Sequence, residues 1–275
     1  MFAKYEECDI IYNMAKTALI AGKEMPAGSK FADGFSLSGR NISITGPELE
    51  KHDEDDDSDK IQQISEASGI SIVEWNKTSP ISSRTIILST ESMFGKMDEA
   101  ILFFDEEWFA SLEQRMNTQE CIRGCDELIL PYQSLALEVL SRFEQKNSDS
   151  HPGILVFLIK ETPSNADTLR SPAVRNGISS IASPVVAAAA AAFSAFAENI
   201  AALYGNQSYV NIFLVRGDNS IDVSASDVEF GKWLGTYIDS VVESGIDMDA
   251  KQSLTWVKAG SKVPSRKIHL PFGKR

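Results

Sequence analysis

An alanine-rich stretch between residues 183 and 205 limits what this chain can fold into more than any other feature. Ser183 is a favourable N-cap, Pro184 suits the first helical position, and Gly205 is a typical helix end. Large apolar side chains recur at helical spacing, so one face of the predicted helix is apolar: Phe193, Phe196, Ile200 and Leu203. Roughly 21 residues at ~1.5 Å each give a rod of ~30 Å, which is long enough to cross a domain. We therefore predict a long helix packed inside the fold.

A membrane span is the competing interpretation of this stretch. Alanine is only weakly apolar, and polar side chains lie within or beside the run: Ser183, Ser194, Glu198 and Asn199. These residues favour a core helix, and we predict no membrane segment. The part that follows, 209–215, is a short apolar run of strand length.

Length and charge narrow the class of protein further. A chain of 275 residues with 43% hydrophobic residues is typical of one α/β domain with a sizeable core. The net charge is −13 (26 basic minus 39 acidic residues), which disfavours binding to nucleic acid or to anionic membranes. The first residues, Met1–Glu7, are already charged and no continuous apolar core follows them. We therefore predict no signal peptide and a cytoplasmic protein.

Cysteine and histidine usage indicates neither a disulfide framework nor a metal site. The cysteines are Cys8, Cys121 and Cys125, an odd number without Cys-x-x-Cys spacing. Cys121 and Cys125 lie one helical turn apart, and we interpret them as packed free thiols, with a disulfide or a metal site as the alternative. The histidines are scattered and have no Cys, His or acidic neighbour at zinc spacing: His52, His151 and His269.

Apolar runs alternate with helical patterns along the chain. We predict an amphipathic helix over 3–21, a connection over 27–38 and a solvated acidic loop at 53–57. The predicted strands are 41–45, 70–75, 85–88, 100–104, 153–159, 209–215 and 254–257. The other predicted helices are 60–68, 119–146, 184–204 and 226–243. Pro131 is expected to kink or break the helix that contains it.

Unalternating apolar strands separated by helices indicate a parallel sheet that is buried on both faces. The predicted fold class is α/β, a three-layer doubly wound Rossmann-type fold with a mostly parallel sheet of about seven strands. We expect a helical N-terminal extension over 1–34, a single Rossmann-type domain over 35–260 and a basic tail over 261–275. The tail is interpreted either as a solvated end or as a segment that packs on an acidic neighbour, including one on another subunit.

Particular residues give this pattern a family resemblance. The segment Phe35-Ser-Leu-Ser-Gly-Arg-Asn-Ile-Ser-Ile-Thr-Gly46 resembles the opening of the short-chain dehydrogenase/reductase family. The strand 153–159, the long helix 184–204 and the strand 209–215 resemble the central block of that family. Trp256–Gly260 resembles its closing strand and glycine. The resemblance covers residues 35 to 260 and rests on the order and spacing of elements.

The resemblance implies a dinucleotide site that this sequence matches only in part. The family binds NAD(P) through Thr-Gly, three residues and Gly-x-Gly, whose glycines let the backbone approach the pyrophosphate. Thr45 and Gly46 match, whereas Glu50 and His52 stand at the later glycine positions and Asp53 begins the acidic run. Acids beside a pyrophosphate repel it, so we expect no cofactor, and NAD(P) is disfavoured by these last three residues.

Further acids are candidates for chemistry. Glu74, at the end of a predicted strand, corresponds either to the acid that binds the adenosine ribose or to a surface carboxylate. Asp105 and Glu107 stand where the family has an Asn-Asn-Ala-Gly turn, and in isolation they could form a carboxylate pair for acid–base catalysis. The sequence shows no third group that would orient the pair, and it supplies no defined ligand set for a metal.

The catalytic pair of the family is missing from its expected place. The family uses Tyr-x-x-x-Lys on the long helix, where the lysine lowers the pKa of the tyrosine, and a serine at the preceding strand end. The spacing places the tyrosine near Val186 and the lysine near Ala190, and neither residue type occurs between Arg175 and Tyr204. We therefore predict no catalytic residue, although hydroxyls remain at Thr162, Ser164, Ser179 and Ser180.

Three functions of different class follow. The first is a short-chain-dehydrogenase-like protein without the standard catalytic residues, which acts by binding or assembly. Subunit contacts in the family imply a homo-oligomer through helix 184–204, with Ala189 and Ala192 on the contact face, and the alternative is that these alanines pack on their own sheet. The second is an atypical NAD(P)-dependent oxidoreductase, or another enzyme, that uses non-standard site residues. A third, an adaptor for nucleic acid or membrane surfaces, has the basic tail as its only support.

Overall fold

The computed structural model describes residues 15–47, 70–112, 117–146, 151–171, 180–245 and 250–263. Seven strands form one sheet in the order β3-β2-β1-β4-β5-β6-β7, and every neighbouring pair is parallel. The strands are β1 (Lys16–Ala21), β2 (Arg40–Gly46), β3 (Ser71–Glu74), β4 (Glu99–Asp105), β5 (Gly153–Glu161), β6 (Val210–Asp218) and β7 (Trp256–Lys258). The predicted doubly wound parallel sheet is therefore confirmed.

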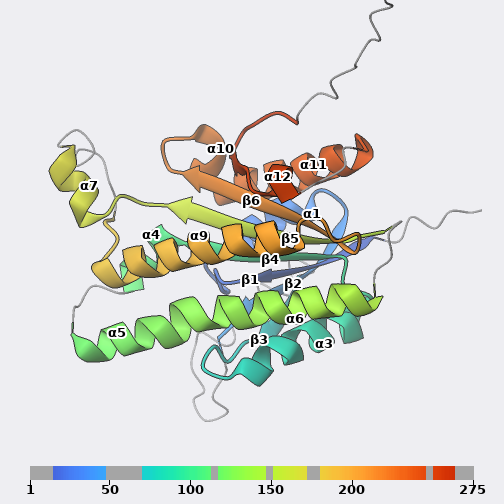
Figure 1. Ribbon diagram of the computed structural model, residues 1–275, viewed down its shortest axis with the longest axis horizontal. Helices are drawn as coiled ribbons and strands as arrows, with labels where there is room; N and C mark the ends of the chain where they lie inside the picture. Colours follow the sequence, from blue (N-terminus) through green and yellow to red (C-terminus); the bar gives the residue numbers. More distant parts are fainter. Residues whose placement is uncertain are drawn as a thin grey trace, which may run out of the picture.

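Helices cover both faces of this sheet (Figure 1). The long helices α3 (Pro80–Phe94), α6 (Leu130–Lys146) and α9 (Pro184–Tyr204) pack on one face. On the other face lie α1 (Ser29–Ser36) and α11 (Asp227–Glu243). Shorter helices are α4 (Glu106–Leu112), α5 (Thr118–Gly124), α7 (Asn165–Arg170), α10 (Asp222–Ala225) and α12 (Ala250–Ser253).

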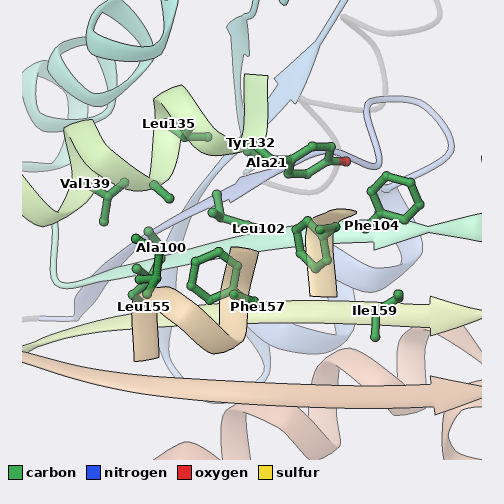
Figure 2. Packing of buried hydrophobic residues seen from close by; sticks show 14 of the residues in the cluster. Ala21, Ala100, Leu102, Phe104, Tyr132, Leu135, Val139, Leu155, Phe157 and Ile159 are labelled. Atoms are coloured by element: carbon green, nitrogen blue, oxygen red, sulfur yellow. The ribbon is translucent and has the colours of Figure 1, made fainter. Parts of the chain in front are cut away.

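Each face has its own apolar core. Figure 2 shows Leu135 and Val139 of α6 packed over the strand residues Leu102 and Phe157. On the opposite face Phe31 of α1 lies 5.8 Å from Phe230 of α11, measured between ring centroids. Continuous apolar strands are required here, because both faces of every central strand are covered.

The alanine-rich helix is confirmed as α9, with the predicted start and end. The Ser183 hydroxyl accepts a hydrogen bond from Val186 N at 3.3 Å, as an N-cap should. Phe193 and Ile200 are buried where α9 packs on β5 and β6, whereas Leu203 is 67% exposed, so its predicted place on the packed apolar face is wrong. Within the described ranges α9 is also the one helix long and apolar enough to cross a membrane, but here it serves as a core helix.

Several predicted elements are wrong near the start of the chain. Residues 16–21, predicted as helix, form the central strand β1, and the predicted connection 27–38 contains α1. Residues 16–34 are thus part of the Rossmann-type sheet and its first helix, not of a helical extension. Periodicity could not decide this segment, because a short apolar run such as Ala18–Ala21 suits a buried strand equally well.

The predicted strand 85–88 is also wrong, since these residues lie inside α3. Its β-branched residues suggested a strand, but Ser79 and Pro80 form a helix start. The predicted helix 60–68, the acidic run 53–57 and the tail beyond 263 fall outside the described residues.

The predicted break near Pro131 is confirmed in a specific form. A π-helical turn, Cys125–Ile129, separates α5 from α6. Proline has no N–H to donate, and its ring would clash with the carbonyl of Glu127 in a regular helix, so the wider turn relieves the clash. Cys121 and Cys125 on this segment are exposed, so the prediction of packed thiols is wrong for both.

Glycines allow α1 and α11 to cross closely. A Cβ atom at Gly34 would contact the backbone carbonyl of Val228, and one at Gly231 would contact that of Phe31. In the C-terminal part of α11, Asp239 accepts hydrogen bonds from the guanidinium of Arg40. The same guanidinium donates to the buried carboxylate of Glu99 at 2.6 and 2.9 Å. Together these contacts hold α11 against the sheet.

Candidate functional site

The carboxyl ends of the parallel strands meet at one edge of the sheet. The strand order reverses between β1 and β4, because the chain runs outward from β1 through β2 to β3 and then returns to β4. In doubly wound folds, ligands bind in the crevice at such a switch point. The loop after β1 and the turn after β4 therefore define the candidate site.

The loop after β1 contains the glycines that a dinucleotide-binding loop uses. Gly22 has φ of 122° and lies against Phe103 O, so no other residue fits there without strain. Gly22, three residues, then Pro26-x-Gly28 match the first and last glycines of the family motif, with proline at the middle position. This loop was not predicted, because residues 16–21 fall within the helix predicted over 3–21.

Thr45 and Gly46 end β2, the second strand in the chain, so their predicted place at the end of the first strand is wrong. The Thr45 hydroxyl supports the loop after β1 by accepting a hydrogen bond from Gly22 N at 3.3 Å. Gly46 lies opposite Glu74 in the β2–β3 register, and the Glu74 side chain is exposed. Glu50, His52 and Asp53 lie outside the described residues, so their predicted repulsion of a pyrophosphate stays a prediction.

A network of ion pairs fills the crevice at the switch point. Lys23 of the glycine loop binds Asp105 at 2.6 Å and Asp227, the first residue of α11, at 2.5 Å. Lys160 at the end of β5 binds Asp227 at 3.2 Å and approaches Glu107 within 3.7 Å. The Lys23 side chain is only 9% exposed and that of Asp105 only 1%. Two lysines thus pair with three carboxylates inside the crevice, which leaves the network with a net charge of −1.

The pKa values of this network reflect mutual stabilisation of charge. Burial alone would lower the pKa of Lys23, but the charges of Asp105 and Asp227 outweigh it and the net pKa is raised. Burial alone would raise the pKa of Asp227, yet Lys23 and Lys160 lower it overall. Both groups are therefore held in their charged forms.

A second ion pair closes the crevice on the side of β3. Lys77, which follows β3, binds Glu24 of the glycine loop at 2.9 Å. The Lys77 ammonium also lies 5.7 Å from the ring centroid of Trp75 and 5.6 Å from that of Trp108. These contacts tie together the loops that follow β1, β3 and β4.

The remaining predicted site residues have structural contacts. Asp105 Oδ1 accepts hydrogen bonds from the backbone N–H groups of Glu107 and Trp108, so it caps α4 as well as binding Lys23. The structure does bring Asp105 and Glu107 to one site, but lysines neutralise both. Glu107 also accepts a hydrogen bond from Asn219 of the loop after β6 at 2.7 Å.

Among the described residues, the candidate hydroxyls of Thr162 and Ser164 are engaged in local structure, whereas the Ser180 hydroxyl is buried and has no hydrogen-bond partner. Thr162 donates to Ser180 O at 3.3 Å, and Ser164 forms a capping box with Asp167 at the start of α7. Ser179 lies outside the described residues. Val186 and Ala190, at the positions expected for the catalytic pair, are buried in the core.

Glu106 is a site residue that the sequence analysis did not single out. Its carboxylate is 8% exposed and accepts a hydrogen bond from Thr162 N at 3.1 Å. Burial raises the pKa of Glu106 to about 7, the hydrogen bond from Thr162 opposes the rise, and Glu161 and Asp105 add to it. The only sequence signal was its position after an apolar strand. In the described part of the chain no three metal-ligating residues gather at one point.

Comparison with known proteins supports the fold. No family model and no curated protein matches the sequence. Among solved structures, NADH-dependent reductase A1-R′, responsible for alginate metabolism, matches with a TM-score of 0.58 at 15% identity, covering 91% of this chain and 98% of that one. The same reductase complexed with NAD matches with a TM-score of 0.57 at 14% identity, with the same coverage. A short chain dehydrogenase from Mycobacterium smegmatis matches with a TM-score of 0.55 at 16% identity, covering 91% and 93%. The chain therefore has the Rossmann-like fold of the short-chain dehydrogenase/reductase structures.

Proposed function

We propose that this protein is a non-catalytic member of the short-chain dehydrogenase fold that acts by binding or assembly. The observation that carries the proposal is the network of Lys23, Asp105, Asp227 and Lys160 at the switch point. A dinucleotide in this crevice would have to displace buried, paired charges. Breaking such a pair by removing one partner costs about 3–5 kcal/mol, which a ligand would have to offset.

The backbone of the glycine loop supports the same conclusion. Gly28 N donates to Glu24 O at 2.8 Å and Ser29 N donates to Pro26 O at 3.1 Å. A pyrophosphate at the start of a helix is normally bound by free N–H groups of this kind. Here two of them are already satisfied by the loop itself.

Calorimetric titration with NADH and NADPH at near-physiological salt tests the proposal. We expect no heat of binding up to millimolar cofactor, because the crevice is filled by its own side chains. Binding at micromolar strength would refute the proposal and establish that the network opens for a dinucleotide.

The second candidate is an atypical NAD(P)-dependent oxidoreductase. One observation favours it: Gly22 and Gly28 stand in the right loop, after the right strand. Micromolar cofactor binding in the same titration would support it. Catalytic turnover would then have to use side chains at this edge of the sheet as proton donors or acceptors. Glu106 is the first residue to replace in an activity assay, because it is buried and its pKa of about 7 lets it carry a proton near neutral pH.

For the assembly role we propose a homo-oligomer through the outer face of α5, α6 and α9. These helices contact one another, and they carry four exposed large apolar side chains, Ile122, Leu130, Leu137 and Leu203. Exposed alanines on α9 leave room for close helix packing: Ala188, Ala191 and Ala195. Ala192 is half-buried, whereas Ala189 is 1% exposed and faces the core, so it is unsuited to a subunit contact.

Sedimentation velocity of charged variants tests this face. Ala191→Arg and Leu137→Arg should each convert the oligomer to monomer while the far-ultraviolet circular dichroism stays unchanged. Leu169→Arg is the matched control, because Leu169 is 84% exposed on α7, away from this face. A wild-type protein that sediments as a monomer, or variants that remain oligomeric, would argue against the interface.

A further inference from the structure

The free edge of the sheet beside β3 borders a cavity. β3 pairs with β2 on one side, and among the described residues no strand pairs with its other side. A cavity of about 570 Å³ lies between this edge and α3. Its walls include Ile72 and Glu74 of β3 and, on α3, Thr85, Ser89, Ser92 and Met93. We call this cavity the β3 groove.

The β3 groove offers unused hydrogen-bonding groups. In the described part of the chain the hydroxyls of Ser89 and Ser92 make no hydrogen bond, and Glu74 makes no ion pair. Edge strands are protected by short length, charged side chains, proline or a bulge; Ser71–Glu74 is short and ends in Glu74, but it has no proline or lysine. An edge of this kind next to a groove can accept a short extended peptide strand, and its charge favours a basic one.

The C-terminal segment of the chain has the chemistry to occupy such a groove. Residues 261–275 contain five basic residues and no acid: Lys262, Arg266, Lys267, Lys274 and Arg275. Ile268, Leu270 and Phe272 alternate with other residues, a pattern typical of an extended strand. A basic strand complements the carboxylate of Glu74 and the strongly acidic chain as a whole.

Geometry excludes the chain's own tail as the occupant. The described chain ends at Val263, two residues after Ser261, whose N–H donates to Lys258 O at the end of β7, and β7 and β3 are the opposite edges of the sheet. Six strand spacings of ~4.8 Å separate these edges by ~29 Å. Five to seven extended residues beyond Val263 reach only about 16–23 Å at ~3.3 Å each. The segment around Ile268–Leu270 cannot reach the groove of its own molecule.

We propose that the β3 groove binds the C-terminal segment of a second copy of this chain by strand addition. The backbone of the Arg266–Phe272 segment pairs with the free edge of β3, and its basic residues lie near Glu74. The contact joins different surfaces of the two molecules, so it is head-to-tail. It is separate from the α5, α6 and α9 face and does not depend on that proposal.

Fluorescence anisotropy with a labelled peptide of residues 261–275 and the full-length protein tests this inference. We expect saturable binding that weakens as salt is raised, and that weakens roughly two- to fivefold in Glu74→Lys, as an exposed ion pair allows. Glu243→Lys is the matched control, because it makes the same charge change at an exposed position on α11, on the opposite face. It should bind the peptide as the wild type does.

Two altered peptides separate strand addition from simple charge attraction. A scrambled peptide keeps the charge but not the alternation, and a peptide N-methylated at Ile268 and Leu270 cannot donate hydrogen bonds to β3. Each should bind at least roughly fivefold more weakly, the scale expected for lost backbone hydrogen bonds. Three outcomes would overturn the inference. The scrambled peptide could bind as tightly as the natural one, Glu74→Lys and Glu243→Lys could weaken peptide binding equally, or the natural peptide could fail to bind.

Discussion

Replacement of Lys23 by methionine is the sharpest test of the charge network in the crevice. The change keeps much of the side-chain volume but leaves Asp105, 1% exposed, without its cation and leaves Asp227 with Lys160 alone. Removal of one partner from a buried pair costs about 3–5 kcal/mol, and we expect about 3 kcal/mol because Asp227 keeps one partner. For a chain of this size each kcal/mol lowers Tm by about 2–4 °C, so Tm should fall by roughly 6–12 °C.

A double variant distinguishes charge imbalance from loss of packing. Lys23→Met combined with Asp105→Leu removes one cation and one anion, which leaves Lys160 paired with Asp227. Urea unfolding should show that the double variant recovers at least half of the stability lost by Lys23→Met. The reasoning fails if Lys23→Met costs less than about 1 kcal/mol, or if the double variant is no more stable than the single one.

The pH dependence of this loss has a definite sign. The pKa of Asp227 is lower in the folded protein than in the unfolded chain. Its contribution to the free energy of unfolding is therefore fully present above the unfolded pKa and is lost as pH falls through the folded pKa. Lys23 has a raised pKa, so its contribution is present below its unfolded pKa and is lost as pH rises through the folded value. The stability difference between the wild type and Lys23→Met should therefore be largest near neutral pH and shrink at both extremes.

Three further predictions concern stability and are tested by urea unfolding. The pKa of Glu106 is raised from 4.5 to about 7, so the folded state holds a proton that the unfolded state has lost in this pH interval. As pH rises through it, the free energy of unfolding of the wild type should fall by about 3 kcal/mol relative to that of Glu106→Gln. A difference between the two proteins that stays constant with pH would contradict the raised pKa. Gly231→Ala should lower the free energy of unfolding by about 1–3 kcal/mol, because the added Cβ meets the Phe31 carbonyl. The control Lys232→Ala, at the exposed neighbouring position, should change it by no more than about 0.5 kcal/mol. Equal losses in the two variants would count against a close crossing of α1 and α11. Glu99→Ala should lower the free energy of unfolding by about 3 kcal/mol, because the side chains of Glu99 and its partner Arg40 are both fully buried. Lys16→Ala removes a lysine that is 40% exposed and should lower it by less than about 1 kcal/mol. Similar losses in the two variants would show that burial does not set the strength of these ion pairs.

The fold class could be predicted because its strongest signals are local. The cap at Ser183, the proline at 184 and the apolar spacing that follows define α9 without tertiary information. The apolar runs of β4, β5 and β6 are long enough to indicate buried parallel strands. By contrast, the run at Ala18–Ala21 is too short for its period to be read, and it was assigned to a helix.

That one error displaced the predicted cofactor loop by a whole strand. Once β1 was missed, Thr45 and Gly46 took the place of the loop at Gly22, and the acids that follow β2 in the sequence were used to argue against a cofactor. The network that fills the crevice could not be predicted at all. Lys23, Asp105, Lys160 and Asp227 come from four separate segments and meet only in the folded sheet.

The crossing of α1 and α11 has a consequence for how the chain is made. Phe31 and Phe35 of α1 are fully buried, and the cover that α11 provides begins at Asp227. α1 ends at Ser36, so 191 residues (227 − 36) must be synthesised before this cover can form. At ~5–20 residues per second, the ribosome exposes this aromatic surface for roughly 10–40 s. The nascent chain therefore presents a ready site for a chaperone until its last long helix emerges.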